Sequence, residues 1–163
     1  MSLALAACES VPRDPSGVDG RLAVQVDAYG SEAARSFSSS FSLRGDDRIG
    51  SLELSSPLST VARAQWRAGE ATLVTSNETR QYASVDAMAQ DLLGTSVPMA
   101  ALMTWLRGKP WEGAAFQRLA SPPGFVQLGW EVDLSRRHEG LLVAVRPTPA
   151  PRVTLRARLD TPS

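Results

Sequence analysis

The 163-residue chain has few of the residues that most often carry chemistry. It holds one cysteine, Cys8, and one histidine, His138. A single cysteine excludes an internal disulfide, and this pair is too small for a zinc site built from His and Cys. His138 lies in Arg136-Arg137-His138-Glu139, which is typical of an exposed turn. The order of residues alone leaves a Ser-His-Asp arrangement open, but the chain has no Gly-x-Ser-x-Gly elbow and no glycine-rich phosphate loop. We therefore predict a protein that is not an enzyme and needs no metal or cofactor.

The chain also has no excess of either charge. Its 17 basic and 17 acidic residues give a formal net charge of zero, so no global field attracts nucleic acid, and we predict no such partner. No apolar run approaches the ~20 residues of a membrane-spanning helix. Apolar residues make up 43% of the chain, which is enough for one domain with its own core.

The one cysteine follows Leu5-Ala6-Ala7, the pattern that bacterial lipoprotein signals present to their processing enzymes. The small residues suit a narrow peptidase cleft, and the Cys8 thiolate accepts the lipid. Each buried methylene contributes roughly 0.8 kcal/mol, so that two or more acyl chains form a stable anchor. Residues 1–8 lack a basic region and a full apolar region, and we interpret them as the remnant of a signal peptide that ends at the lipidation site. The alternative is a cysteine placed near the N-terminus by chance.

Residues 9–20 are rich in proline and glycine and predict a linker. Residues 21–160 then form the single folded domain. Most of this domain has a hydrophobic period of two, which predicts short antiparallel strands with one polar face. The apolar positions of the first five strands are Leu22, Val24 and Val26; Phe37, Phe41 and Leu43; Leu52 and Leu54; Ala62, Ala64 and Trp66; and Leu73 and Val74.

Two short helices interrupt the strands. Ser84 is a good N-cap, the apolar residues from Val85 to Leu93 recur at helical spacing, and Gly94 is a typical stop. Pro98 is expected in the first turn of a second helix that ends near Gly108. Strands resume after Trp111, for a total of about nine. The last of these carries a basic face with Arg152, Arg156 and Arg158.

Several motifs occur in an order that resembles the LolB family of outer-membrane lipoprotein receptors. Besides Cys8, they are Gly20-Arg21-Leu22-Ala23-Val24; Leu52-Glu53-Leu54-Ser55-Ser56-Pro57-Leu58; Leu92-Leu93-Gly94 with Val97-Pro98, Leu102, Trp105-Leu106, Gly108 and Pro110; and Gly129-Trp130. The resemblance implies a mainly β (α+β) fold, an open antiparallel half-barrel with a few short helices that cover its concave apolar side. It also implies an acyl-chain cavity on that side, where methionines adapt to irregular ligands. The expected lining is Leu22, Val24, Phe37, Phe41, Leu43, Leu52, Leu54, Trp66, Met88, Leu92, Met99, Leu102, Met103, Leu106 and Trp130. The alternative is that these side chains fill an ordinary core.

Leu58 follows Pro57 among serines at the predicted tip of a hairpin. The matching position of the family carries a protruding leucine that supports membrane insertion of the cargo. Burial of such a side chain contributes roughly 1.5–3 kcal/mol, enough for transient membrane contact. The alternative is a leucine folded down over the rim.

The resemblance implies a monomeric receptor, anchored through Cys8 to the periplasmic face of the outer membrane. It would accept lipoproteins from a periplasmic, LolA-like carrier by binding their acyl chains, and would insert them into the outer-membrane lipid without nucleotide hydrolysis. Two alternatives remain open on the same scaffold, a lipid-binding protein without insertion activity and a structural envelope lipoprotein. The basic strand face could meet an acidic rim of the carrier or lipid headgroups, or could simply be solvated and discourage edge-to-edge pairing.

Overall fold

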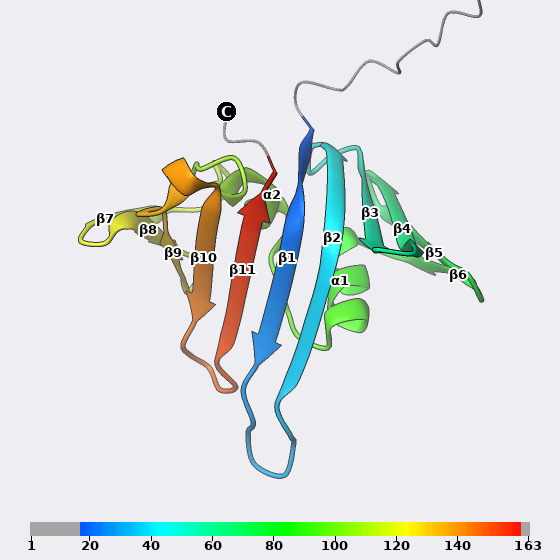
Figure 1. Ribbon diagram of the computed structural model, residues 1–163, viewed down its shortest axis with the longest axis horizontal. Helices are drawn as coiled ribbons and strands as arrows, with labels where there is room; N and C mark the ends of the chain where they lie inside the picture. The colour runs from blue at the N-terminus through cyan, green and yellow to red at the C-terminus, as the bar shows by residue number, and fades with distance from the viewer. Residues whose placement is uncertain (1–16, 161–163) are drawn as a thin grey trace, which may run out of the picture.

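The computed structural model describes residues 17–160. Within them the chain forms one antiparallel sheet of eleven strands with two α-helices, a 3-10 turn and an open, curved outline (Figure 1). The strands are β1 (Val18–Val26), β2 (Arg35–Gly45), β3 (Gly50–Ser56), β4 (Ser59–Arg67), β5 (Glu70–Thr75), β6 (Thr79–Tyr82), β7 (Phe116–Ala120), β8 (Pro123–Gln127), β9 (Trp130–Asp133), β10 (Leu141–Arg146) and β11 (Val153–Leu159).

The sheet order places the two ends of the domain next to each other in its middle. The order is β6-β5-β4-β3-β2-β1-β11-β10-β9-β8-β7, and β6 and β7 are the two edges, which do not pair with each other. Both helices, α1 (Val85–Leu93) and α2 (Met99–Trp105), lie behind β1, β2 and β11 in Figure 1, on the face toward which the sheet curves. The predicted open half-barrel with helices on its concave side is confirmed.

Three details differ from the sequence prediction. The edge strands β6 and β7 were not predicted, because nearly all their side chains are exposed and leave no alternating apolar signal. The predicted linker, residues 9–20, extends too far at its C-terminal end, because β1 begins at Val18 and includes residues 18–20. Gly20 lies within this strand. A Cβ at this position would lie 2.2 Å from the Arg158 carbonyl oxygen of β11, so the absence of a side chain allows the two backbones to approach closely. Cys8 and the rest of the predicted signal remnant lie outside the described residues.

The helix boundaries follow the capping signals closely. The Ser84 hydroxyl accepts a hydrogen bond from the Ala87 amide at 3.1 Å, and Gly94 ends α1 with a φ of 69°. Pro98 is the N-cap of α2 and not a residue of its first turn. Because Met99, Ala101, Leu102, Met103 and Trp105 are all buried, α2 is a core helix rather than an amphipathic one.

Candidate functional site

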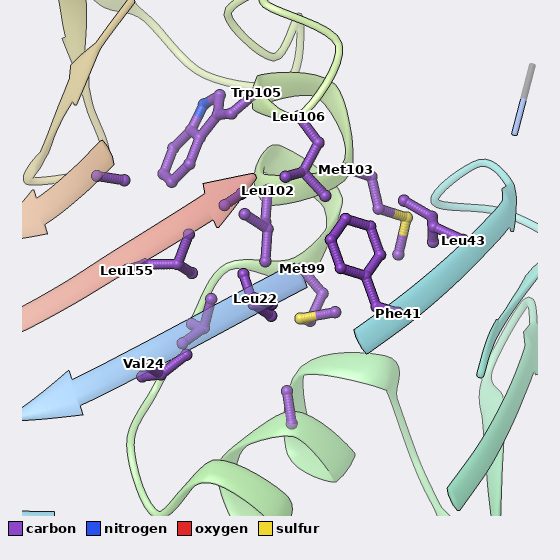
Figure 2. Close-up of a cluster of buried hydrophobic side chains, with 14 of the residues drawn as sticks. Leu22, Val24, Phe41, Leu43, Met99, Leu102, Met103, Trp105, Leu106 and Leu155 are labelled. Carbon is purple, nitrogen blue, oxygen red and sulfur yellow. The ribbon is translucent and has the colours of Figure 1, made fainter. Parts of the chain in front are cut away.

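The concave side of the sheet gathers the side chains that were predicted to line an acyl-chain cavity. Twelve of the fifteen are buried in one hydrophobic cluster, and Phe37, Leu52 and Leu92 are partly buried against it. Figure 2 shows Leu22 and Val24 from β1 and Phe41 and Leu43 from β2 facing residues of α2. The sheet and the helices thus form one continuous apolar region.

This region is nearly filled in the described conformation. A cavity of about 30 Å³ remains beneath α1, roughly the volume of one water molecule. Its lining is almost wholly apolar and includes Leu22, Phe37 and Leu54 of the sheet, Met88 and Leu92 of α1, and Met99 and Leu102 of α2. A hydrocarbon chain of many methylenes needs far more space, so its entry requires an element of the concave side to move.

The helix α1 is the least deeply seated part of this region. Only Met88 and Ala89 are buried, whereas Val85, Leu92 and Leu93 are half-buried. The sheet edge beside α1 is also weak, because β6 is a four-residue strand that pairs with β5 alone. Lifting α1 therefore exposes few fully buried side chains, each worth roughly 1.5–3 kcal/mol.

Polar contacts hold α1 from outside the apolar region. The Asp91 carboxylate accepts hydrogen bonds from the Tyr82 hydroxyl and, at 2.9 Å, from the Arg80 guanidinium. These bonds lower the pKa of Asp91, the tyrosine first and the arginine second. At the other end of the helix, Arg35 donates to the Gly94 carbonyl at 3.0 Å. These groups are exposed, and solvent-screened pairs of this kind contribute little each.

The segment after α1 is tied to the far half of the sheet by Arg146. Its guanidinium donates to the Ser96 carbonyl at 3.1 Å and to the Thr95 hydroxyl at 3.4 Å. The same group lies 5.7 Å from the Trp130 ring centroid, a distance suited to a cation–π contact. This anchor fixes the segment before α2. The start of α1 is joined to the start of α2 by the Asp86 carboxylate, which accepts a hydrogen bond from the Met99 amide at 2.9 Å.

In contrast to α1, α2 is held by a buried polar side chain that sequence reasoning missed. The Gln127 carbonyl oxygen accepts hydrogen bonds from the Trp105 indole at 2.8 Å and from the Trp111 amide at 2.9 Å. Its amide nitrogen donates to the carbonyls of Trp111 at 2.7 Å and Ala114 at 2.9 Å. Gln127 is 2% exposed. A lone glutamine in a strand gives no sequence signal of this role, because its partners come from a distant helix and loop.

The β3–β4 hairpin presents Leu58 to solvent. Leu58 is 96% exposed, so it is not folded over the rim. The ladder between β3 and β4 shifts register next to it, with Leu54 opposite Ala62 but Ser55 opposite Thr60. This bulge leaves Val61 without an opposite residue, and its side chain is 48% exposed.

Charged groups near this hairpin neutralise each other. The Glu53 carboxylate accepts hydrogen bonds from Arg63 at 3.1 Å and from the Thr60 hydroxyl at 3.2 Å. An ion pair of this kind carries no net charge toward an approaching surface. The tip is therefore an apolar projection on a neutral base, which suits contact with the interior of a bilayer.

His138 is exposed in the predicted polar turn, 3.6 Å from the Glu139 carboxylate. No group of three potential metal ligands occurs among the described residues. In that same part of the chain, none of the helices has the length and apolar character to cross a membrane.

The comparisons with known proteins agree with this architecture. The profile of the family described as "Outer membrane lipoprotein LolB" matches residues 17–159. The chain belongs to the LolB family. The chain is 36% identical to the outer-membrane lipoprotein LolB of Bordetella petrii, over 97% of this chain and 87% of the relative. It shares the same identity and coverage with LolB of Bordetella pertussis, and 28% identity with LolB of Chromobacterium violaceum over 80% of this chain and 69% of that relative.

Membership of the LolB family supports an outer-membrane location and a role in lipoprotein localisation. The LolB motifs noted in the sequence now have structural positions. The Leu-Gly and Val-Pro motifs end α1 and begin α2, Trp105 contacts Gln127, and Leu58 occupies the hairpin tip.

Proposed function

We propose that this member of the LolB family accepts lipoproteins from a periplasmic, LolA-like carrier and inserts them into the outer membrane. It binds their acyl chains between the concave face of the sheet and α1. The protein acts as a monomer, held on the periplasmic face of the membrane through lipids on Cys8. It is not an enzyme and hydrolyses no nucleotide. The observation that carries this proposal is the apolar region beneath a shallowly seated helix.

The shallow packing of α1 against the sheet allows a filled interior to accept a lipid. When α1 moves outward, the half-buried Leu92 and Leu93 and the buried Met88 separate from the sheet. An acyl chain that enters replaces these contacts with its own, so that the apolar surface stays covered. The side chains of Met88 and Met99 are flexible and polarizable, and they can adapt to the irregular shape of the guest.

The same arrangement favours release. Binding must be strong enough to remove lipid from the carrier but weaker than insertion into a bilayer, because no nucleotide drives the transfer. Part of the free energy of lipid binding is spent on lifting α1, and closure of α1 restores its own apolar contacts when the lipid leaves. The affinity for lipid is therefore lower than that of a preformed, open cavity with the same lining.

Photo-crosslinking tests the acyl-chain site directly. A photoreactive amino acid replaces Leu92 on the concave side or Val74, which is 44% exposed, as the matched control. Each variant receives lipoprotein from the loaded carrier before irradiation. We expect crosslinks to the acyl chains from position 92 and none from position 74. Equal crosslinking from both positions, or from neither while cargo is held, would refute the proposed site.

The alternative of a lipid-storage protein differs in the delivery step. A storage protein has no need for an apolar side chain held in solvent at a neutral hairpin, and Leu58 therefore favours insertion. Delivery of accepted cargo to vesicles separates the two functions. Wild-type protein that keeps its cargo in the presence of excess vesicles would support storage.

A further inference from the structure

The exposed apolar side chains of the described residues gather at one end of the sheet. This end, which we call the lower end, carries the turns β1–β2, β3–β4, β5–β6 and β8–β9, and the β1–β2 connection marks it at the bottom of Figure 1. Ile49, in the β2–β3 turn, is the one exposed large apolar residue of the described chain at the opposite end. The others lie in the lower turns or beside them in the strands, and they are Tyr29, Leu58, Val61, Val74, Phe116 and Leu128.

Leu128 is held at this end in an unfavourable backbone conformation. With Gly129 it forms the two-residue turn between β8 and β9, and φ is 54° at Leu128 and 79° at Gly129. A turn with positive φ at both positions favours Asn-Gly or Gly-Gly, because a leucine side chain is crowded by the backbone in the left-handed region. Within residues 17–160, no other non-glycine residue has a positive φ. The backbone of the turn therefore does not by itself explain a leucine here.

The turn is open to solvent. Leu128 is 47% exposed, and a Cβ at Gly129 would meet no atom within 4 Å. The neighbouring Phe116 pairs with Gln127, is similarly exposed, and lies with its ring centroid 6.2 Å from that of the buried Phe125. Two large apolar side chains are thus presented side by side on a base that is fixed to the core.

The charges beside this turn balance. Arg118 on β7 and Glu131 on β9 are both exposed and have opposite signs. The β8–β9 turn is therefore an apolar projection without a net charge at its base, as the β3–β4 hairpin is. The two projections belong to opposite halves of the sheet, on either side of β1 and β11.

The C-terminal end of α1 lies at the same lower end, between these two projections. Arg35, the first residue of β2, donates to the Gly94 carbonyl that follows α1. Arg146, the last residue of β10, donates to the Ser96 carbonyl. In Figure 1, α1 lies behind the central strands of the sheet. One end of the acyl-chain site is thus flanked by an apolar turn on each half of the sheet.

We propose that the β8–β9 turn is a second membrane-contacting tip, at which Leu128 and Phe116 enter the boundary between lipid headgroups and acyl chains. The inference rests on the proposed function and deepens its delivery step. Membership of a family of outer-membrane lipoproteins places a bilayer next to the protein, and large apolar and aromatic side chains favour this boundary. A second copy or another soluble protein is the less suitable partner, because two side chains cover far less than the roughly 800 Å² per partner of a stable interface.

A second tip gives the protein a defined orientation on the membrane. A single apolar side chain at Leu58 lets the domain rotate about that contact, whereas contacts on both halves of the sheet hold the lower end against the bilayer. An acyl chain that leaves the site beside Gly94 then passes into lipid with little exposure to water, which is the costly step for a hydrocarbon chain.

A fluorophore at the turn tests membrane contact directly. Cys8 is the one cysteine of the chain and is blocked by lipid in the anchored protein, so an introduced cysteine is the single free thiol. Leu128→Cys, or Ile49→Cys as the matched control at the opposite end, receives an environment-sensitive fluorophore in the full lipidated chain. The protein is then added to phosphatidylcholine vesicles with or without brominated lipid. We expect a blue shift and quenching by brominated lipid at position 128 and neither at position 49.

Equal quenching at both positions, or none at position 128, would overturn the inference. A blue shift at position 128 without quenching by brominated lipid would also overturn it, because it would assign the turn to a protein partner such as a second copy.

Replacement of Leu128 by asparagine separates membrane contact from a packing role. Asparagine tolerates the left-handed conformation, so the melting temperature should not fall. Delivery of accepted lipoprotein to vesicles should slow by about threefold to tenfold. Ile49→Asn should deliver within about twofold of the wild type. Unchanged delivery by the Leu128 variant, or slower delivery together with a lower melting temperature, would contradict a membrane role. Quenching is measured without cargo, so a failure of lipid acceptance alone would refute the proposed function and not the second tip.

Discussion

Replacement of Leu58 by glutamate separates acceptance of the cargo from its delivery. Because the side chain is 96% exposed, the variant loses almost no contact within the protein. Its free energy of unfolding should stay within about 0.5 kcal/mol of the wild type, as for other surface substitutions. Full burial of a leucine in a membrane contributes roughly 1.5–3 kcal/mol. Loss of that contribution corresponds to a decrease of about tenfold to a hundredfold in membrane engagement.

The assay follows the two steps separately. Lipoprotein on the carrier is first mixed with the Leu58→Glu variant, and transfer is measured by co-purification; vesicles are then added, and lipoprotein that sediments with them is counted as delivered. We expect normal acceptance and delayed delivery. Ile49→Glu is the matched control, since Ile49 is another exposed apolar residue in a hairpin, 68% exposed. Equal delivery by the Leu58 variant and the wild type would refute the membrane role of the tip, as would an equal defect in the Ile49 variant.

Three further predictions concern the parts of the fold that position the site. Gln127→Leu leaves the Trp105 indole without its acceptor, and urea denaturation should show a loss of about 1–3 kcal/mol, whereas an unchanged midpoint would contradict a supporting role for this side chain. The lowered pKa of Asp91 means that its bond to Tyr82 stabilises α1 fully above the ordinary value of 3.8 and is lost as the pH falls below it. The protection of the α1 amides against hydrogen exchange should therefore decrease as the pH falls below 3.8, and Asp91→Asn should abolish this dependence. Gly20→Ala places a Cβ 2.2 Å from a carbonyl oxygen of β11 and should lower the melting temperature by several degrees in calorimetry, which a wild-type value would disprove.

The helices show how well local signals predict local structure. Ser84 and Gly94 bound α1 as their capping chemistry predicts, because a cap depends on hydrogen bonds within a few residues. The strands with one buried face were equally readable from their alternation. The edge strands β6 and β7 were not, since an edge strand is defined by its hydrogen bonds to a neighbour and its exposed side chains follow no apolar period.

The residues of the candidate site also fall into two groups, those that the sequence predicts and those that it does not. The apolar residues of the concave side were predictable because they recur at strand and helix spacing and because their motifs resemble those of a known family. Gln127 and Arg146 were not predictable, since their partners lie far away in the chain. The exposed arginines on the face of the sheet opposite the helices combine both cases. The basic face of the last strand was visible in the sequence, but its pairing with Arg21 across β1 was not.

The sequence by itself determined which residues become strands with one apolar face, where the two helices begin and end, and which family the chain resembles. These properties depend on periodicity, capping and short motifs, all of which act over a few neighbouring residues. Only the tertiary structure decided that the interior beneath α1 is nearly filled, that Leu58 projects into solvent, and that β11 lies at the centre of the sheet. These properties depend on which distant segments pack together, and pairwise packing across the sheet leaves no mark on the local pattern of residues.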